Sequence, residues 1–119
     1  MGKRVHVAKC YKIEWGSTEA FNWAHEDFYN TLKALGGDPC WCGTDGEISD
    51  DFECSVEDYD DAIANLEVYI ADQHLLSESD KITETLEGIR MTAEELLDIM
   101  KRYRNEADVY SGYLHFSAF

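Results

Sequence analysis

Hydrophobic and polar residues alternate along the first part of the chain. Apolar side chains occupy odd-numbered positions there, namely Val5, Val7, Tyr11, Ile13 and Trp15. A period of two is typical of a strand with one buried face. The pattern therefore predicts a strand over residues 5–15.

Apolar residues at helical spacing predict two long helices farther along the chain. Ser17 or Thr18 can cap the first helix, and Gly36 followed by Gly37 supplies a left-handed stop. The apolar positions of this helix are Phe21, Ala24, Phe28, Leu32 and Leu35. Ser55 can cap the second helix. Its apolar positions are Tyr59, Ile63, Leu66 and Ile70.

Two further helices are expected before the end of the chain. Over residues 72–91 the apolar positions fit a helix, although the Thr-Glu-Thr run at 83–85 also suits a strand, and we favour a short helix. These positions are Ile82, Leu86 and Ile89. Thr92 and Glu95 make a capping box for a helix that ends near Glu106.

Residues 40–54 predict a β-hairpin, because Asp45-Gly46 readily takes the backbone angles of a two-residue turn. Counting across this turn pairs Cys42 with Ser49 and Cys40 with Asp51. A last strand is expected near the C-terminus. Its apolar residues Tyr110, Leu114, Phe116 and Ala118 are mingled with polar ones.

The order of these elements predicts an α+β fold, with a small antiparallel sheet packed by helices on one face. It resembles the split βαβ arrangement of ferredoxin-like folds, with extra C-terminal helices and with the first and last strands side by side. At 119 residues, we expect residues 1–119 to form a single domain.

Composition supports a packed core in a cytoplasmic protein. Hydrophobic residues make up 45% and aromatic residues 13% of the chain, despite a net charge of -15. We find neither a signal peptide nor a membrane-spanning run. The four cysteines, Cys10, Cys40, Cys42 and Cys54, are expected to be free thiols.

The negative charge is concentrated in one segment. Residues 34–80 hold 14 acidic residues and neither Lys nor Arg, whereas the rest of the chain holds 11 acidic and 10 basic residues. Nine of the acids fall within 17 residues: Asp45, Glu47, Asp50, Asp51, Glu53, Glu57, Asp58, Asp60 and Asp61. Like charges one helical turn apart, such as Glu57 and Asp61, repel by roughly 0.2–0.5 kcal/mol per pair.

We interpret these nine acids as a surface that binds a basic partner, with the chain acting as a small non-enzymatic interaction protein. A special case is a nucleic-acid mimic that inhibits a DNA-acting enzyme. Trp23 falls among the polar positions of the first predicted helix and is a candidate partner anchor. The alternative is that the charge serves only solubility.

Direct binding to nucleic acid is disfavoured, because a net charge of -15 repels phosphate. The basic residues form a cluster only at residues 101–104, near a helix C-terminus, where cations are favoured for structural reasons. No membrane partner is expected.

Candidate chemistry is sparse, and we predict no catalytic residue, metal site or cofactor. Cys40 and Cys42 share a strand face and offer two thiolates to zinc, but a structural site needs two further ligands. The alternative function is a small enzyme or ligand-binding domain that uses His115 and Tyr113 on the last strand. The candidate cluster around His115 and Tyr113 also includes Ser111, together with His6 or Cys10 on the first strand.

Overall fold

The computed structural model describes residues 5–10, 14–19, 25–43, 51–107, 109 and 112–118. The elements are β1 (Val5–Cys10), β2 (Glu14–Glu19), α1 (His25–Ala34), β3 (Cys40–Trp41), β4 (Asp51–Ser55), α2 (Val56–Asp72), the 3-10 turn η2 (Gln73–Leu75), α3 (Ser79–Ile89), α4 (Ala93–Glu106) and β5 (Tyr113–Ala118). The predicted α+β class with an antiparallel sheet and helices is confirmed.

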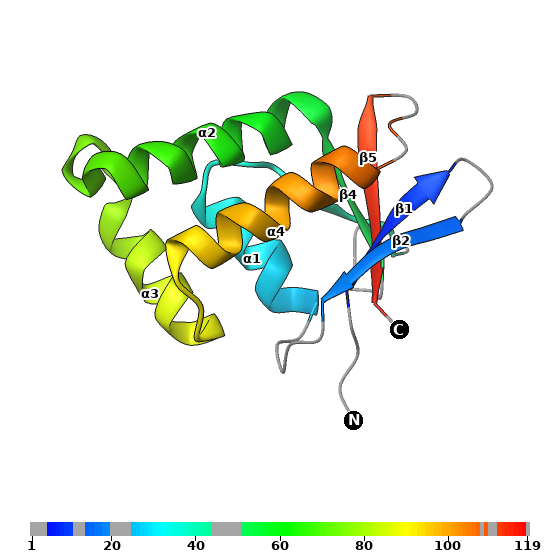
Figure 1. Cartoon of the computed structure of the whole chain (residues 1–119), viewed down its shortest axis with the longest axis horizontal. Coiled ribbons are helices and arrows are strands. Elements are labelled where there is room, and N and C mark those ends of the chain that lie inside the picture. The colour runs from blue at the N-terminus through cyan, green and yellow to red at the C-terminus, as the bar shows by residue number, and fades with distance from the viewer. Residues whose placement is uncertain are drawn as a thin grey trace.

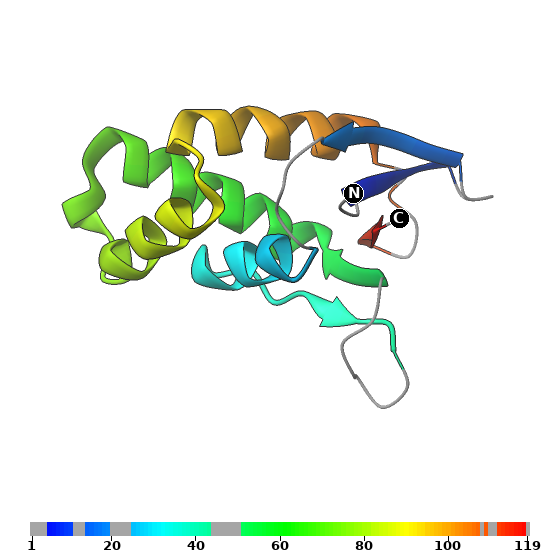
Figure 2. The same ribbon diagram turned by 90° about the horizontal axis from the view of Figure 1, so that it is seen from below.

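The strands meet in one sheet. Four of them lie in the order β1-β5-β4-β3, and β2 pairs with the outer edge of β1, which gives β2-β1-β5-β4-β3. Every neighbouring pair is antiparallel. Figures 1 and 2 show α1, α2 and α4 on the same side of this sheet, with α3 farther out against α1.

The prediction of one strand over residues 5–15 is wrong, because two strands occupy this region. β1 ends at Cys10, which pairs with Glu14 at the start of β2. Ser17 and Thr18 lie within β2 and therefore do not cap a helix. An alternating pattern is the same in both arms of a hairpin, so the period of two does not locate the reversal.

The expected split βαβ arrangement is correct in one respect and wrong in another. The first and last strands do lie side by side, with Val5 opposite Ala118 and Val7 opposite Phe116. However, β4 and β5, which the last three helices connect, are adjacent and antiparallel, whereas a split βαβ unit connects parallel strands with another strand between them. The position of β2 explains the difference. Because β2 pairs with one edge of β1, β5 pairs with the other edge and so lies between β1 and β4.

Alternate residues of the two central strands build the core. Phe52 and Cys54 of β4, and Leu114 and Phe116 of β5, are fully buried on the side that faces the helices. Phe28 of α1 meets Phe116 edge to face, with ring centroids 5.3 Å apart. The helix-facing side of the sheet is therefore apolar.

Two buried tyrosines join the layers through their hydroxyl groups. Tyr59 of α2 donates to the carbonyl oxygen of Met100 in α4 at 2.8 Å. Tyr103 of α4 donates to the carbonyl oxygen of Val5 in β1 at 3.1 Å. A buried hydroxyl needs such a partner, and these bonds tie α2 to α4 and α4 to the sheet.

Three helix termini follow their predicted signals. The Ser55 side chain accepts a hydrogen bond from the backbone N–H of Asp58 and caps α2. Thr92 and Glu95 form the capping box of α4. Gly36 follows α1 with a φ of 90°, the left-handed conformation that glycine adopts without strain.

The ambiguous segment over residues 72–91 contains the 3-10 turn and α3, so the favoured helix is confirmed. Ile82 and Leu86 are buried on one face of α3. The Thr83 hydroxyl donates to the carbonyl oxygen of Ser79 within the same helix at 3.0 Å.

The longest helix that the structure describes, α2, has 17 residues and carries six acidic ones. No described helix combines the length and the apolar composition that crossing a bilayer requires.

Candidate functional site

The side of the sheet that faces away from the helices is polar. Along β4, the half-buried residues Asp51, Glu53 and Ser55 alternate with the buried core residues. Along β5, His115 and Ser117 take the corresponding positions opposite Glu53 and Asp51. We call this surface the open face and define it by Cys42, Asp51, Glu53, His115 and Ser117.

Three side chains of the open face bring together three kinds of metal-binding atom. The Cys42 sulfur, a Glu53 carboxylate oxygen and a His115 ring nitrogen all lie within 4.8 Å of one another. His115 Nδ1 is 3.2 Å from Glu53 Oε1, within hydrogen-bond distance. Among the residues that the structure describes, this is the one group of three His, Cys, Asp or Glu side chains close enough to share an ion.

The register of β3 and β4 differs from the one that counting predicted. Cys40 lies opposite Glu53 and not opposite Asp51, which is a shift of two residues. The backbone N–H of Cys42 donates to the carbonyl oxygen of Asp51 at 3.0 Å and continues the ladder past Trp41. Since a shift of two conserves the face, Cys40 and Cys42 stay on the open side while Cys54 points into the core.

A second polar contact lies beside the three-residue cluster. The Ser117 hydroxyl donates a hydrogen bond to Asp51 Oδ1. His6 of β1 lies opposite Ser117 across the β1–β5 ladder. Polar residues thus follow one another from β3 across β4 and β5 to β1.

Burial and negative neighbours favour the protonated thiol at Cys42 and at Cys54. Burial, then the charges of Glu53 and Asp51, raises the pKa of Cys42 to about 11. Burial is also the main reason that the pKa of Cys54 rises to about 12. Without a nearby cation, neither thiol is a ready nucleophile at neutral pH.

Of the cluster predicted around the last strand, the structure brings only part together. Tyr113 lies opposite Ser55 with its ring exposed, on the same face as His115. His115 lies within hydrogen-bond distance of Glu53 on β4, and His6 of β1 lies opposite Ser117 on β5. Ser111 and the side chain of Cys10 lie outside the described residues.

The acidic residues predicted to bind a partner are divided between two surfaces. Asp51 and Glu53 belong to the open face, whereas Glu57, Asp58, Asp60 and Asp61 lie in the first two turns of α2 (Figure 1). The other four predicted residues, Trp23, Asp45, Glu47 and Asp50, lie outside the described residues.

The acidic residues on the two sides of α2 differ in their ion pairing. On the side toward α4, Asp60 pairs with Arg104 at 2.9 Å, and Glu67 pairs with Lys101 at 3.5 Å. Glu57 and Asp61 are exposed, and neither forms an ion pair with another described residue.

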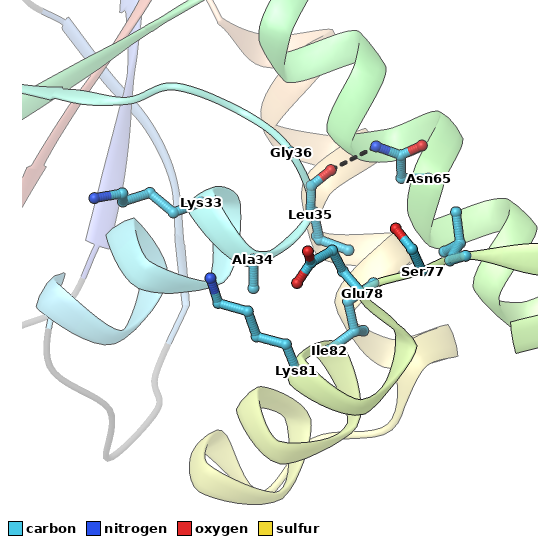
Figure 3. Close-up of a pocket in the computed structure, with 10 residues that line it drawn as sticks. Lys33, Ala34, Leu35, Gly36, Asn65, Ser77, Glu78, Lys81 and Ile82 are labelled. Carbon is cyan, nitrogen blue, oxygen red and sulfur yellow. Dashed lines mark hydrogen bonds between the residues drawn. The ribbon is translucent and has the colours of Figure 1, made fainter.

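A cleft lies elsewhere, between the end of α1 and helices α2 and α3 (Figure 3). It has a volume of about 450 Å³. Asn65 lines it, but its side-chain amide is engaged with the carbonyl oxygen of Leu35 at 2.7 Å. The Lys33 ammonium lies over the Tyr29 ring, 5.7 Å from its centroid, and points away from Asn65 in Figure 3. The cleft therefore offers less convergent chemistry than the open face.

In the sequence, Cys42, Glu53 and His115 are each candidates for a different reason, and no pattern places them together. The sequence does not reveal that β4 pairs with β5. This pairing brings Glu53 and His115 together, although they are 62 residues apart in sequence. No protein-family model matches the chain, and no curated protein or solved structure matches it significantly. Function is therefore inferred from the chemistry of the described residues.

Proposed function

We propose that this chain is a non-enzymatic interaction protein that binds a basic protein partner through the acidic first turns of α2. The observation that carries the proposal is the pair Glu57 and Asp61. Both side chains are exposed, and neither forms an ion pair with another described residue. Trp23 and the predicted acids outside α2 remain predicted partner-binding residues.

The contrast between the two sides of α2 supports this choice. Arg104 and Lys101 of α4 pair with Asp60 and Glu67, so the negative charge on that side is matched within the protein. Charges that a protein leaves unmatched on its surface steer and orient an oppositely charged partner. A basic surface is therefore complementary to the Glu57–Asp61 side.

Helix capping accounts for some of these acids but not for all. Asp58 lies three residues after the cap Ser55, and Glu57 and Asp58 both lie in the first turn, where the helix dipole favours negative charge by about 0.3–1 kcal/mol each. Asp61 lies beyond the first turn and one turn from Glu57, where the two carboxylates repel. Asp61 is thus the residue whose charge is better explained by a partner than by helix stability.

A finer form of the proposal is that the partner handles nucleic acid and that the carboxylates imitate phosphates. Side chains one helical turn apart have Cβ atoms about 5–6 Å apart, a spacing close to that of phosphates along one strand. A DNA-acting enzyme inhibited in this way would release the protein when DNA is added.

The test uses three baits to capture proteins from a lysate of source cells at two salt concentrations. They are the wild type, the double variant Glu57→Gln/Asp61→Asn and the double variant Asp60→Asn/Glu67→Gln. Each variant loses two negative charges. The first loses them from the Glu57–Asp61 side of α2, and the second loses them from the side that faces α4. We expect the wild type and Asp60→Asn/Glu67→Gln to retain a basic protein that the first variant loses.

Binding is then reproduced with the purified partner, and DNA is added as a competitor. Retention of the same proteins by all three baits would show that these acids do not bind the partner. Equal losses from both variants would show that net charge alone determines binding. Either result leaves solubility as the role of the acidic segment.

A further inference from the structure

We propose that Cys42, Glu53 and His115 form a binding site for a divalent transition-metal ion of the zinc type. The three donors come from the strands β4 and β5 and from the residue that follows β3. The site goes beyond the partner binding proposed above and does not depend on it.

The chemistry of the donors selects the class of ion. Thiolate sulfur and imidazole nitrogen favour zinc and similar transition metals, whereas magnesium and calcium prefer oxygen ligands alone. One carboxylate oxygen completes a set of three in which each ligand is of a type that binds zinc. A mixed set of this kind differs from a group of acids that attracts cations only by charge.

The spacing of the donors suits one ion. Zinc lies about 2.0–2.3 Å from its ligands, which places neighbouring ligand atoms of a tetrahedral site about 3.3–3.8 Å apart. Glu53 Oε1 and His115 Nδ1 are already 3.2 Å apart, and the Cys42 sulfur lies within 4.8 Å of the cluster. The Cys42 side chain is exposed, so its sulfur is free to rotate toward the other two ligand atoms.

The strands fix two of the ligands in place. Glu53 and His115 are direct partners in the β4–β5 ladder, and the β3–β4 ladder brings Cys42 beside them through its bond to the carbonyl oxygen of Asp51. A site built on paired strands holds its geometry better than one on loops. The His115 side chain is only 19% exposed, so it is partly shielded from water.

The electrostatic surroundings favour a cation. The strands β3, β4 and β5 contain neither Lys nor Arg, and Asp51 adds a further carboxylate beside the cluster. A divalent ion would bind Cys42 as the thiolate, and the carboxylates around it would balance the charge of the ion. Three protein ligands leave a fourth position for water or another ligand.

The experiment titrates the purified, reduced protein with Co²⁺, which reports on thiolate coordination through its charge-transfer absorption, and then displaces it with Zn²⁺. Five single variants accompany the wild type. Cys42→Ser, Glu53→Gln and His115→Gln each remove one proposed ligand. Cys40→Ser removes a neighbouring exposed thiol, and a fifth variant, Glu57→Gln, removes an acid of α2 that lies outside the site.

We expect one Co²⁺ per chain, with a charge-transfer band that persists in Cys40→Ser and is lost in Cys42→Ser. Glu53→Gln and His115→Gln should weaken affinity at least tenfold, and Glu57→Gln should leave it within twofold of the wild type. The proposal is overturned if Co²⁺ does not saturate at one per chain, if Cys42→Ser retains the band, or if Glu57→Gln weakens binding as much as Glu53→Gln.

A second measurement does not depend on the ligand variants being folded. Alkylation of Cys42 and of Cys40 by iodoacetamide is followed in the wild type by tandem mass spectrometry of the peptide that contains both, with and without Zn²⁺. We expect Zn²⁺ to slow the reaction of Cys42 at least tenfold and to leave Cys40 unchanged. Equal effects on both thiols, or no effect on either, would contradict the site. Neither assay contains a protein partner, so failure of the metal site and failure of the proposed function are distinguishable.

Discussion

Glu53 and His115 face each other across the β4–β5 ladder, with Glu53 Oε1 3.2 Å from His115 Nδ1. This contact joins the acidic segment to the last strand of the chain. Both side chains are partly shielded, at 36% and 19% exposure. The pair therefore contributes to the sheet as well as to the chemistry of the open face.

We predict a favourable coupling between these two side chains in the absence of metal. Cross-strand polar pairs contribute about 0.2–1 kcal/mol to stability. A double-mutant cycle with Glu53→Gln, His115→Gln and the double variant, measured by urea unfolding with a chelator present, should give a coupling in that range. Additive effects of the two substitutions would mean that the contact does not stabilise the sheet.

The capping box of α4 should have a measurable effect on stability. The Thr92 hydroxyl accepts from the backbone N–H of Glu95 at 3.1 Å. Thr92→Ala leaves that N–H without its partner and should lower the free energy of unfolding by about 0.5–2 kcal/mol. Thr85→Ala is the control, since the Thr85 hydroxyl only donates to a carbonyl of its own helix. It should change stability by less than about 0.5 kcal/mol.

The sequence predicted the helices better than the sheet, and for a physical reason. Capping by Ser55 and by Thr92 with Glu95 depends on residues three positions apart, so a local pattern contains the information. The reversal between Cys10 and Glu14, and the shift that places Cys40 opposite Glu53, depend on pairing between segments. A shift of two residues keeps each side chain on the same face of the sheet. The alternation of polar and apolar residues therefore does not distinguish between such registers.

The candidate site shows the same limit. Cys42, Glu53 and His115 meet only because β5 inserts between β1 and β4, and no local signal specifies that order. The sequence does identify which residues can carry chemistry, since each of the three was a candidate on its own. Their meeting depends on the topology of the whole sheet.

Two glycines should respond in opposite directions to substitution by alanine. At Gly36 the φ is 90°, and an added Cβ would lie 2.9 Å from Asn65 Nδ2. Gly36→Ala should therefore destabilise the protein by about 1 kcal/mol or more. At Gly88, within α3, an added Cβ meets nothing within 4 Å, and Gly88→Ala should stabilise by about 0.5–1 kcal/mol. Thermal unfolding of both variants is the measurement, and a stabilised Gly36→Ala would contradict the left-handed stop after α1.

The buried thiol of Cys54 should make the fold sensitive to alkaline pH. Burial raises its pKa from the ordinary value of 9.0 to about 12. Between these values the unfolded chain releases a proton that the folded protein retains, so stability falls as pH rises above about 9, by at most about 1.4 kcal/mol per pH unit for this group. Below pH 8 the thiol is protonated in both states and contributes no slope. Urea unfolding from pH 8 to 10.5 should therefore give a steeper decline for the wild type than for Cys54→Ala, whatever the absolute stability of the variant. Parallel curves would show that Cys54 titrates normally in the folded protein, and hence that the core side of β4 is open to water.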